Sequence, residues 1–224
     1  MSPSITRRSL LARMTGATAV LACGLLFAAV NPAHAQEGAE PAAAPEAPAA
    51  PAMVGPQYSI KTSMGEIVLQ LDQEKAPRTV ANFAAYAKSG FYKGTIFHRV
   101  IDGFMIQAGG MNEKFEGRKT LKPVKNESDN GLSNQPYSIA MAREDNPDSA
   151  TSQWFINVAD NSGIDHPFVK GSGYTVFGKV VKGQEVVDKI KGVVVDDVRG
   201  MQNVPVVPIK ITNVTLLKGD KLVK

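Results

Sequence analysis

The most informative run of this 224-residue chain is Phe97-His98-Arg99-Val100-Ile101-Asp102-Gly103-Phe104-Met105-Ile106-Gln107-Ala108-Gly109-Gly110. Its apolar and β-branched residues predict two short strands, at about residues 95–100 and 104–107. Strict alternation along a strand would place Phe104 and Met105 on opposite faces of the sheet. Both side chains can line one pocket only if the chain bends, and Gly103 favours a bend there.

A second informative run lies downstream of the first. Residues 138–143 read Ser-Ile-Ala-Met-Ala-Arg, and residues 150–157 read Ala-Thr-Ser-Gln-Trp-Phe-Ile-Asn. Both contain a predicted strand, at about residues 137–142 and 154–158. Strand alternation directs Trp154, the only tryptophan, toward the core.

The remaining pattern indicates more short strands and only two helices. Pro77, the apolar spacing that follows it and Gly90 predict one helix, and a second is expected at residues 184–191. Further strands are predicted at residues 58–62, 66–71, 174–181 and 209–217. Few helices set far apart disfavour a parallel βαβ sheet and favour an antiparallel barrel or sandwich. The predicted fold class is therefore mainly β.

Residues 1–35 are typical of a secretory signal peptide. Arg7 and Arg8 stand in a positive n-region, and an apolar stretch follows at residues 17–30. Ala33-His34-Ala35 matches a cleavage site, so the mature chain is expected to begin at Gln36 and to be periplasmic. The apolar stretch is short for a membrane span, so no stable membrane insertion is expected after cleavage. The arginine pair also resembles a twin-arginine signal, and an ordinary n-region is an equally open interpretation.

The only cysteine, Cys23, lies inside the apolar stretch. It could be the lipidated residue of a lipoprotein leader, which would anchor the chain at a membrane. Leu21 and the apolar residues after Cys23 fit that alternative poorly. On the main interpretation the mature chain has no cysteine, and therefore neither disulfides nor thiol chemistry.

Residues 36–56 form an Ala/Pro-rich segment with too few apolar side chains to build a core. A disordered, extended linker is predicted there, followed by one folded domain at residues 57–224. The whole chain carries a formal charge of +4, but the part after the leader has 22 basic and 21 acidic residues. No basic stripe remains there, so nucleic acid is not an expected partner.

Together, the two runs resemble the signature regions of cyclophilin-type peptidyl-prolyl cis-trans isomerases. The resemblance extends from Tyr58 to about Leu217, and residues 125–132 and 174–183 are most similar to short bacterial periplasmic members. It implies a closed eight-stranded antiparallel barrel capped by two α-helices. It also implies a cofactor-free, metal-free isomerase that binds proline-containing polypeptides and assists the folding of exported proteins. A monomer is expected.

The resemblance also assigns the residues of the site. The positions that match catalytic residues are Arg99, Phe104 and Gln107. The positions that match substrate-binding residues are Met105, Ala142, Arg143, Gln153, Phe155, Ile164 and Tyr174. Gly163 stands near the place of a tryptophan found in many eukaryotic members, so weak binding of cyclosporin is expected.

An arginine beside an apolar pocket suits this chemistry on physical grounds. Twisting an X-Pro amide breaks its resonance, and the nitrogen regains a lone pair that a donor can hydrogen-bond. Arginine is always charged and presents a rigid fork of donors. Without the resemblance, Arg99 would be interpreted as a solvated strand residue and Phe104 and Met105 as core residues.

Two alternatives remain open from the sequence. A non-catalytic proline-peptide-binding module or chaperone would use the same groove without turnover. A barrel with an unrelated surface function would require the two runs to be coincidental. His98 and His166, the histidines after the leader, lack the spacing of metal ligands, so no metal site is expected.

Overall fold

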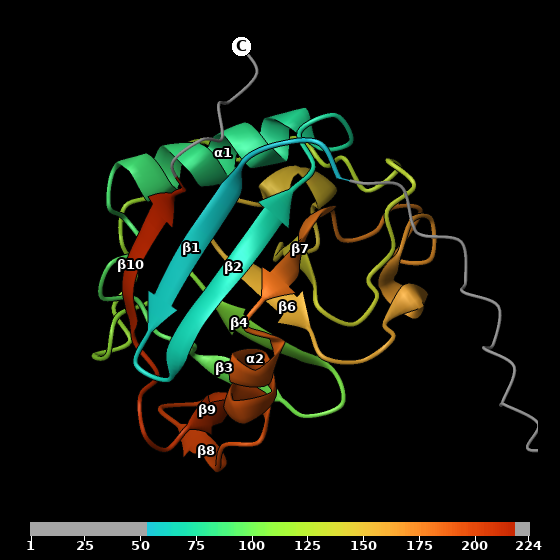
Figure 1. The fold of residues 1–224 in the computed structure, drawn as a ribbon. Coiled ribbons are helices and arrows are strands. Elements are labelled where there is room, and N and C mark those ends of the chain that lie inside the picture. The colour runs from blue at the N-terminus through green and yellow to red at the C-terminus, as the bar shows by residue number, and fades with distance from the viewer. Residues whose placement is uncertain (1–52, 218–224) are drawn as a thin grey trace, which may run out of the picture. The chain divides into compact units, whose positions relative to one another are not determined.

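The computed structural model of the chain describes residues 53–217, which Figure 1 shows as a ribbon. In chain order the elements are β1 (Gln57–Thr62), β2 (Gly65–Leu71), α1 (Pro77–Lys88), β3 (Arg99–Ile101), β4 (Met105–Ala108), β5 (Ser138–Met141), the 3₁₀ turn η1 (Pro147–Ser149), β6 (Trp154–Asn157), the 3₁₀ turn η2 (Ser162–Ile164), β7 (Val176–Lys182), α2 (Gln184–Lys191), β8 (Val195–Val198), β9 (Met201–Pro205) and β10 (Ile211–Leu216). The predicted signal peptide and residues 36–52 of the predicted linker lie outside the described residues.

Eight of these strands form one curled antiparallel sheet, in the order β10-β1-β2-β7-β5-β6-β4-β3. Its two edges meet through a short bridge between Ile96 and Lys210. The backbone N–H of Phe97 donates to the carbonyl of Ile209 at 2.9 Å beside this bridge. The predicted eight-stranded antiparallel fold is confirmed, and a bridge replaces a continuous closing ladder. Within residues 53–217, the two α-helices are the two that the sequence predicts.

The strand predicted at residues 95–100 is divided in the structure. Residues 95–97 bond on one side to the segment around the start of β10 and on the other to Met111 and Asn112, whereas the ladder with β4 begins only at Arg99. The chain thus has bonded partners on both sides before Arg99 and only β4 from Arg99 to Ile101, which a pattern of apolar residues cannot reveal. Arg99 therefore lies on the edge strand of the sheet.

Helix α1 is capped by a carboxylate from a distant loop. Ala76, which precedes the helix, has no side-chain acceptor for the free N–H groups of the first turn. The Glu127 carboxylate accepts hydrogen bonds from the backbone N–H groups of Arg78 at 3.1 Å and Thr79 at 2.9 Å. A negative charge there also interacts favourably with the helix dipole, so this contact ties the loop to α1.

An aromatic cluster fixes the inner face of α1 against the sheet. The Phe83 ring lies 5.3 Å from the rings of Tyr58 and Tyr92, 5.7 Å from Phe177 and 6.5 Å from Trp154, measured between centroids. Trp154 is fully buried, which confirms its predicted orientation. Among residues 53–217, no helix has both the length and the apolar character needed to cross a bilayer.

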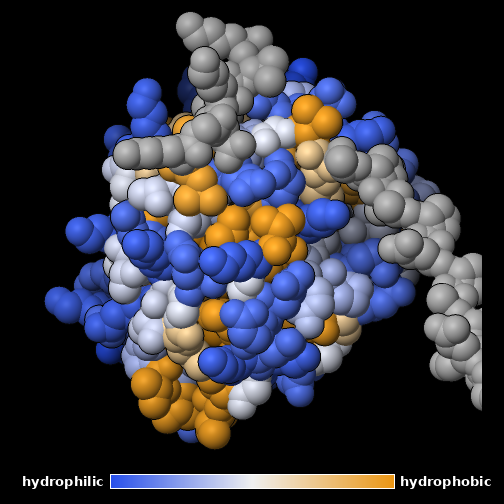
Figure 2. Space-filling view, viewed as in Figure 1, coloured by the Kyte–Doolittle hydropathy of each residue, from blue (hydrophilic) through white to orange (hydrophobic). Residues whose placement is uncertain are grey.

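The hairpin of β8 and β9 was not predicted from the sequence. Its two-residue turn, Arg199-Gly200, has positive φ at both positions, 53° and 79°, as a type I′ turn requires. Arg-Gly is a weaker turn signal than Asn-Gly, and the flanking valines lack clear alternation. Val194, Val206 and Val207 remain exposed at the base of the hairpin, where Figure 2 shows an apolar patch.

Ordered backbone begins upstream of residue 57. The carbonyl of Val54 accepts a hydrogen bond from the Gln73 N–H at 2.8 Å, and that of Pro56 accepts from the Leu71 N–H at 3.1 Å. The first described residues are therefore held along the end of β2, as Figure 1 shows for the start of the coloured chain.

Candidate active site

Two apolar clusters lie on opposite faces of the same strands. The main core lies inside the curled sheet and under α1, and it includes Ile106, Ile139, Trp154 and Ile156. An outer cluster lies on the other face and consists of Met105, Ala140, Phe155 and Val176. Successive residues of a strand point to opposite faces, so chain neighbours such as Trp154 and Phe155 belong to different clusters.

A continuous row of paired residues crosses the outer face. Arg99 pairs with Gln107, and Gln107 pairs with Phe155 on the next strand. Phe155 pairs with Ala140, which in turn pairs with Val176. The register therefore places a guanidinium, an amide and an apolar floor side by side on five strands.

A cavity of about 200 Å³, called here the site cavity, opens over this row. It is lined by Arg99, Phe104, Met105, Gln107, Ala142, Arg143, Phe155, Ile164 and Tyr174. These are nine of the ten residues that the sequence analysis assigned to the site. The tenth, Gln153, lines an adjoining cavity of about 170 Å³ that shares Gln107 with the first.

The bend expected at Gly103 is present. Gly103 has a φ of 73°, in the left-handed region that favours glycine, and β4 begins only at Met105. Phe104 therefore stands in the turn, where its carbonyl accepts a hydrogen bond from the Asn161 side-chain amide at 2.7 Å. This arrangement lets Phe104 and Met105 line the same cavity although they are chain neighbours.

Arg99 has an exposed side chain at the polar end of the row. Within residues 53–217, no carboxylate forms an ion pair with it. The Gln107 amide beside it donates a hydrogen bond to the Gln153 amide oxygen at 2.8 Å. Gly110 lets Gln153 lie close, because a Cβ atom at that position would stand 2.6 Å from the Gln153 side chain. The guanidinium is thus available to a ligand, and the two amides orient each other.

Arg143 is held by the protein itself at the opposite wall. Its guanidinium donates to the Gly173 carbonyl at 3.1 Å and to the Ser172 hydroxyl at 3.0 Å, and it lies 4.7 Å from the centre of the Tyr174 ring. Tyr174 in turn packs edge-on against Phe155 at 5.7 Å. Arg143 therefore fixes the loop that carries Tyr174, and its position favours a supporting role over a reacting one.

His98 lies beneath the row and is almost fully buried. Burial lowers the pKa of His98, hydrogen bonding to Ile96 and Gln153 opposes this, and the charge of Arg99 lowers it further. A neutral imidazole is therefore favoured there at neutral pH.

Three residues of the site were missed by the sequence analysis. Ala140 and Val176 belong to the outer cluster that supports the site cavity without lining it, and Asn161 holds the Phe104 turn. Alternation from Ala142 could have indicated Ala140. Asn161 is 57 residues from Phe104, and no local pattern links them.

No cluster suited to a metal ion occurs in the part of the chain that the structure describes. In residues 53–217, no three His, Cys, Asp or Glu side chains come close enough together to bind one. The site cavity offers instead two guanidinium groups, an amide and apolar walls. Such a lining can bind an uncharged apolar ring next to a carbonyl group.

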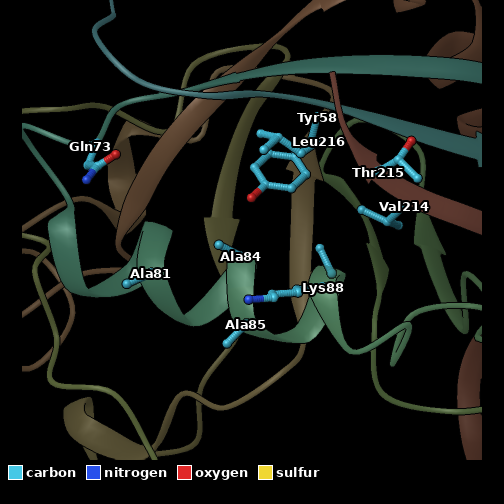
Figure 3. Close-up of a pocket in the computed structure, with 10 residues that line it drawn as sticks. Tyr58, Gln73, Ala81, Ala84, Ala85, Lys88, Val214, Thr215 and Leu216 are labelled. Carbon is cyan, nitrogen blue, oxygen red and sulfur yellow. The ribbon is translucent and has the colours of Figure 1, made fainter. Parts of the chain in front are cut away.

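A larger cavity, of about 760 Å³, lies away from the row. Figure 3 shows it between α1, with Ala81, Ala84 and Lys88, and the strand residues Tyr58 and Leu216. Four of its ten lining residues are alanines, and the lining contains no arginine. Size alone would favour this groove as the active site. The arginine and amide side chains that line the site cavity favour that cavity instead.

Comparison with known proteins gives one consistent family. The family model described as cyclophilin type peptidyl-prolyl cis-trans isomerase/CLD matches residues 57–216. Peptidyl-prolyl cis-trans isomerase A of Dickeya dadantii is 53% identical over 171 residues, which cover 76% of this chain and 90% of that protein. Peptidyl-prolyl cis-trans isomerase cyp18 of Streptomyces antibioticus is 52% identical over 160 residues, covering 70% of this chain and 96% of that protein.

Solved structures agree with these relatives. A crystal structure of a cyclophilin type peptidyl-prolyl cis-trans isomerase of Cryptosporidium parvum aligns with a TM-score of 0.60 at 26% identity, covering 73% of this chain and 98% of that chain. A second crystal structure of that protein, obtained in the presence of the dipeptide ala-pro, aligns with a TM-score of 0.59 at 25% identity.

Proposed function

The chain belongs to the cyclophilin-type peptidyl-prolyl cis-trans isomerases, and we propose that the site cavity is where it isomerises X-Pro bonds of exported proteins. One observation carries this proposal. The register places Arg99, Gln107 and Phe155 side by side on three neighbouring strands, at the edge of a cavity the size of a small ring. The neighbouring structure obtained with the ala-pro dipeptide supports an X-Pro ligand for this cavity.

The reaction needs no nucleophile and no cofactor. An X-Pro bond isomerises in tens to hundreds of seconds unaided, because the twisted amide loses its resonance. The enzyme must favour the twisted amide over the planar one, and each tenfold gain in rate lowers the barrier by about 1.4 kcal/mol. A site that grips the proline ring and stabilises the twisted nitrogen meets this need.

Arg99 is the proposed donor to the proline nitrogen. As the amide twists, this nitrogen becomes pyramidal and accepts a hydrogen bond that the planar amide cannot accept. The Arg99 guanidinium has no ion-pair partner among the described residues, so it can donate without first breaking a salt bridge. Its charge acts beside the apolar wall of Phe155, where an electrostatic interaction is stronger than in water.

The other site residues are proposed to hold the substrate. Phe104, Met105 and Phe155 would grip the ring, with Ile164 and Tyr174 closing the far wall. Gln107 and Gln153, which are already hydrogen-bonded, would bind substrate carbonyl and N–H groups. Ala142 and Arg143 would shape the backbone-binding side. A rigid grip on the ring lets the preceding carbonyl rotate alone.

The periplasm is the proposed location. Arg7-Arg8, the apolar stretch at residues 17–30 and Ala33-His34-Ala35 support export and cleavage before Gln36. Proteins that fold after export carry X-Pro bonds in both isomers, so an isomerase there would shorten slow folding phases. Cell fractionation should recover the cleaved chain in the periplasm. An uncleaved chain in the cytoplasm would contradict this location.

Replacing Arg99 by lysine tests the proposed donor. Lysine keeps the positive charge but loses the planar fork of donors, so Arg99→Lys should lower kcat/KM for a proline tetrapeptide at least about tenfold. Arg78→Lys, at an exposed position on α1, is the matched control and should leave kcat/KM unchanged. Full activity of the Arg99→Lys protein would show that charge alone is sufficient and that the proposed hydrogen bond is not needed.

A further inference from the structure

The segment before the described residues repeats the kind of bond that the enzyme acts on. Residues 44–51 read Ala-Pro-Glu-Ala-Pro-Ala-Ala-Pro, so an Ala-Pro step recurs every third residue, at Pro45, Pro48 and Pro51. A polyproline II helix has three residues per turn. In that conformation the three prolines would lie on one side of the segment, each preceded by alanine.

The described chain begins next to the outer cluster. Met53 and Val54 line a cavity of about 420 Å³ together with Leu132 and Val176. Val176 belongs to the outer cluster, and Leu132 packs against it. The described chain therefore begins on the face of the sheet that carries the site cavity.

Chain length permits the segment to reach that cavity. Along the paired row, Val176 is two strands from Phe155 and four strands from Arg99, or roughly 10 and 19 Å at about 4.8 Å per strand. Pro48 precedes Met53 by five residues and Pro45 by eight, which span about 16 and 25 Å at about 3.1 Å per residue. Pro48 can therefore span the distance to Phe155 but not that to Arg99, and Pro45 can span both, whereas Pro51, two residues from Met53, reaches neither.

Charge also favours this occupant. Arg99 and Arg143 are the charged residues that line the site cavity. Glu46 directly follows Pro45 and Glu40 precedes it by five residues, and residues 36–52 contain no lysine or arginine. An acidic segment is attracted to a cationic groove, and the attraction weakens as salt is added.

We propose that the Ala-Pro steps at residues 44–48 occupy the site cavity of their own chain and compete with substrate. This inference rests on the function proposed above for that cavity. A short tether holds its ligand at an effective concentration in the millimolar range, enough to occupy a weak peptide site for part of the time. The segment would then lower the enzyme's apparent affinity for short peptides, and a client with several X-Pro bonds would displace it.

Kinetics with altered linkers test the competition. The chain from Gln36 contains every described residue, and the test variant carries Pro45→Ala, Pro48→Ala and Pro51→Ala in it. Removing the internal ligand should lower KM for a proline tetrapeptide about twofold or more and leave kcat unchanged. The matched control carries Ala42→Gly, Ala43→Gly and Ala49→Gly, which keep every proline, and should retain the wild-type KM.

Proline-labelled protein tests occupancy directly by NMR exchange spectroscopy. At the Ala44-Pro45 and Ala47-Pro48 bonds, cis/trans exchange should be at least about tenfold faster than in the Arg99→Ala chain, whose exchange should remain near the uncatalysed rate. The rate should not change on dilution, because the segment binds its own chain. A rate that falls with dilution would show binding between two copies and would overturn the inference.

The two proposals can fail separately. If the chain accelerates tetrapeptide exchange but its KM is unaffected by the three proline substitutions and the linker bonds exchange slowly, the inference is wrong and the proposed function stands. If Arg99→Ala leaves tetrapeptide turnover unchanged, the proposed role of the cavity fails and the inference fails with it.

Discussion

The two faces of β4, β5 and β6 are made from alternate residues of the same short segments, yet one face builds the main core and the other carries the site cavity. The inward residues Ile106, Ile139 and Trp154 join an extensive, fully covered core under α1. The outward cluster has only four buried members, and a cavity flanked by polar groups opens over it. Stability should therefore depend mainly on the inner face and substrate turnover on the outer face.

The largest expected effect is on stability, at the centre of the main core. Phe83→Ala removes a ring that contacts four other aromatic rings and should lower the free energy of unfolding by about 3–5 kcal/mol. The folded fraction should keep its kcat/KM. Urea unfolding measures the loss, and Phe168→Ala, at a side chain 71% exposed, should change stability by less than about 0.5 kcal/mol. Equal losses in both variants would contradict the division.

The cap of α1 should have the next largest effect. Glu127→Gln removes the negative charge from two backbone hydrogen bonds at the helix N-terminus and should cost about 1–2 kcal/mol of unfolding free energy. Tetrapeptide kinetics should stay the same, because neither Glu127 nor the helix residues that it caps line the site cavity. Glu116→Gln, in an exposed loop, is the matched control. A fall in kcat at unchanged stability would show that the loop serves the site.

His98 should make stability depend on pH. Because burial lowers its pKa in the folded protein, the unfolded chain binds a proton more readily. The contribution of neutral His98 to the free energy of unfolding is fully present above the unfolded-state pKa of about 6.5. It is lost as pH falls toward the lowered pKa of the folded protein, by less than about 1.4 kcal/mol per pH unit. His98→Gln should flatten urea-unfolding stability between pH 7 and 5, and the exposed control His166→Gln should not. An unchanged pH dependence in His98→Gln would refute the assignment.

The smallest expected effect concerns the far wall of the site. Arg143→Lys removes the fork that bonds Gly173 and Ser172, so the Tyr174 loop should loosen and KM should rise about threefold with kcat nearly unchanged. Arg118→Lys is a matched control, since Arg118 also bonds carbonyl groups and stacks on a ring, but far from the cavity. A fall in kcat with constant KM would instead indicate that Arg143 acts in the reaction.

Much of the fold could be predicted from local pattern. The second helix was predicted at residues 184–191 and lies there, because glycines flank it on both sides. The β8–β9 hairpin was missed because Arg199-Gly200 is a weak turn signal. The division of the strand at residues 95–100 depends on pairing with a segment more than 110 residues away, which no local pattern contains.

The residues that line the site cavity could be predicted from the sequence better than the contacts that hold those residues in place. Alternation explains why Gln107 and Phe155 share a face, but the assignment of Arg99 needed the family resemblance, since an exposed strand arginine is unremarkable by itself. The hydrogen bond from Asn161 to Phe104 and the stacking of Arg143 on Tyr174 join distant segments. Such contacts depend on the tertiary structure, so no local sequence pattern could predict them.

The most direct test compares two neighbouring residues of β3, Arg99 on the outer face and Val100 in the main core. Arg99→Ala should lower the rate of tetrapeptide cis/trans exchange about a hundredfold or more and leave the free energy of unfolding within about 0.5 kcal/mol of the original. Val100→Ala should cost about 2 kcal/mol of stability and leave exchange by the folded protein unchanged. If Arg99→Ala retained full activity, or if both variants lost activity and stability together, the account would be contradicted.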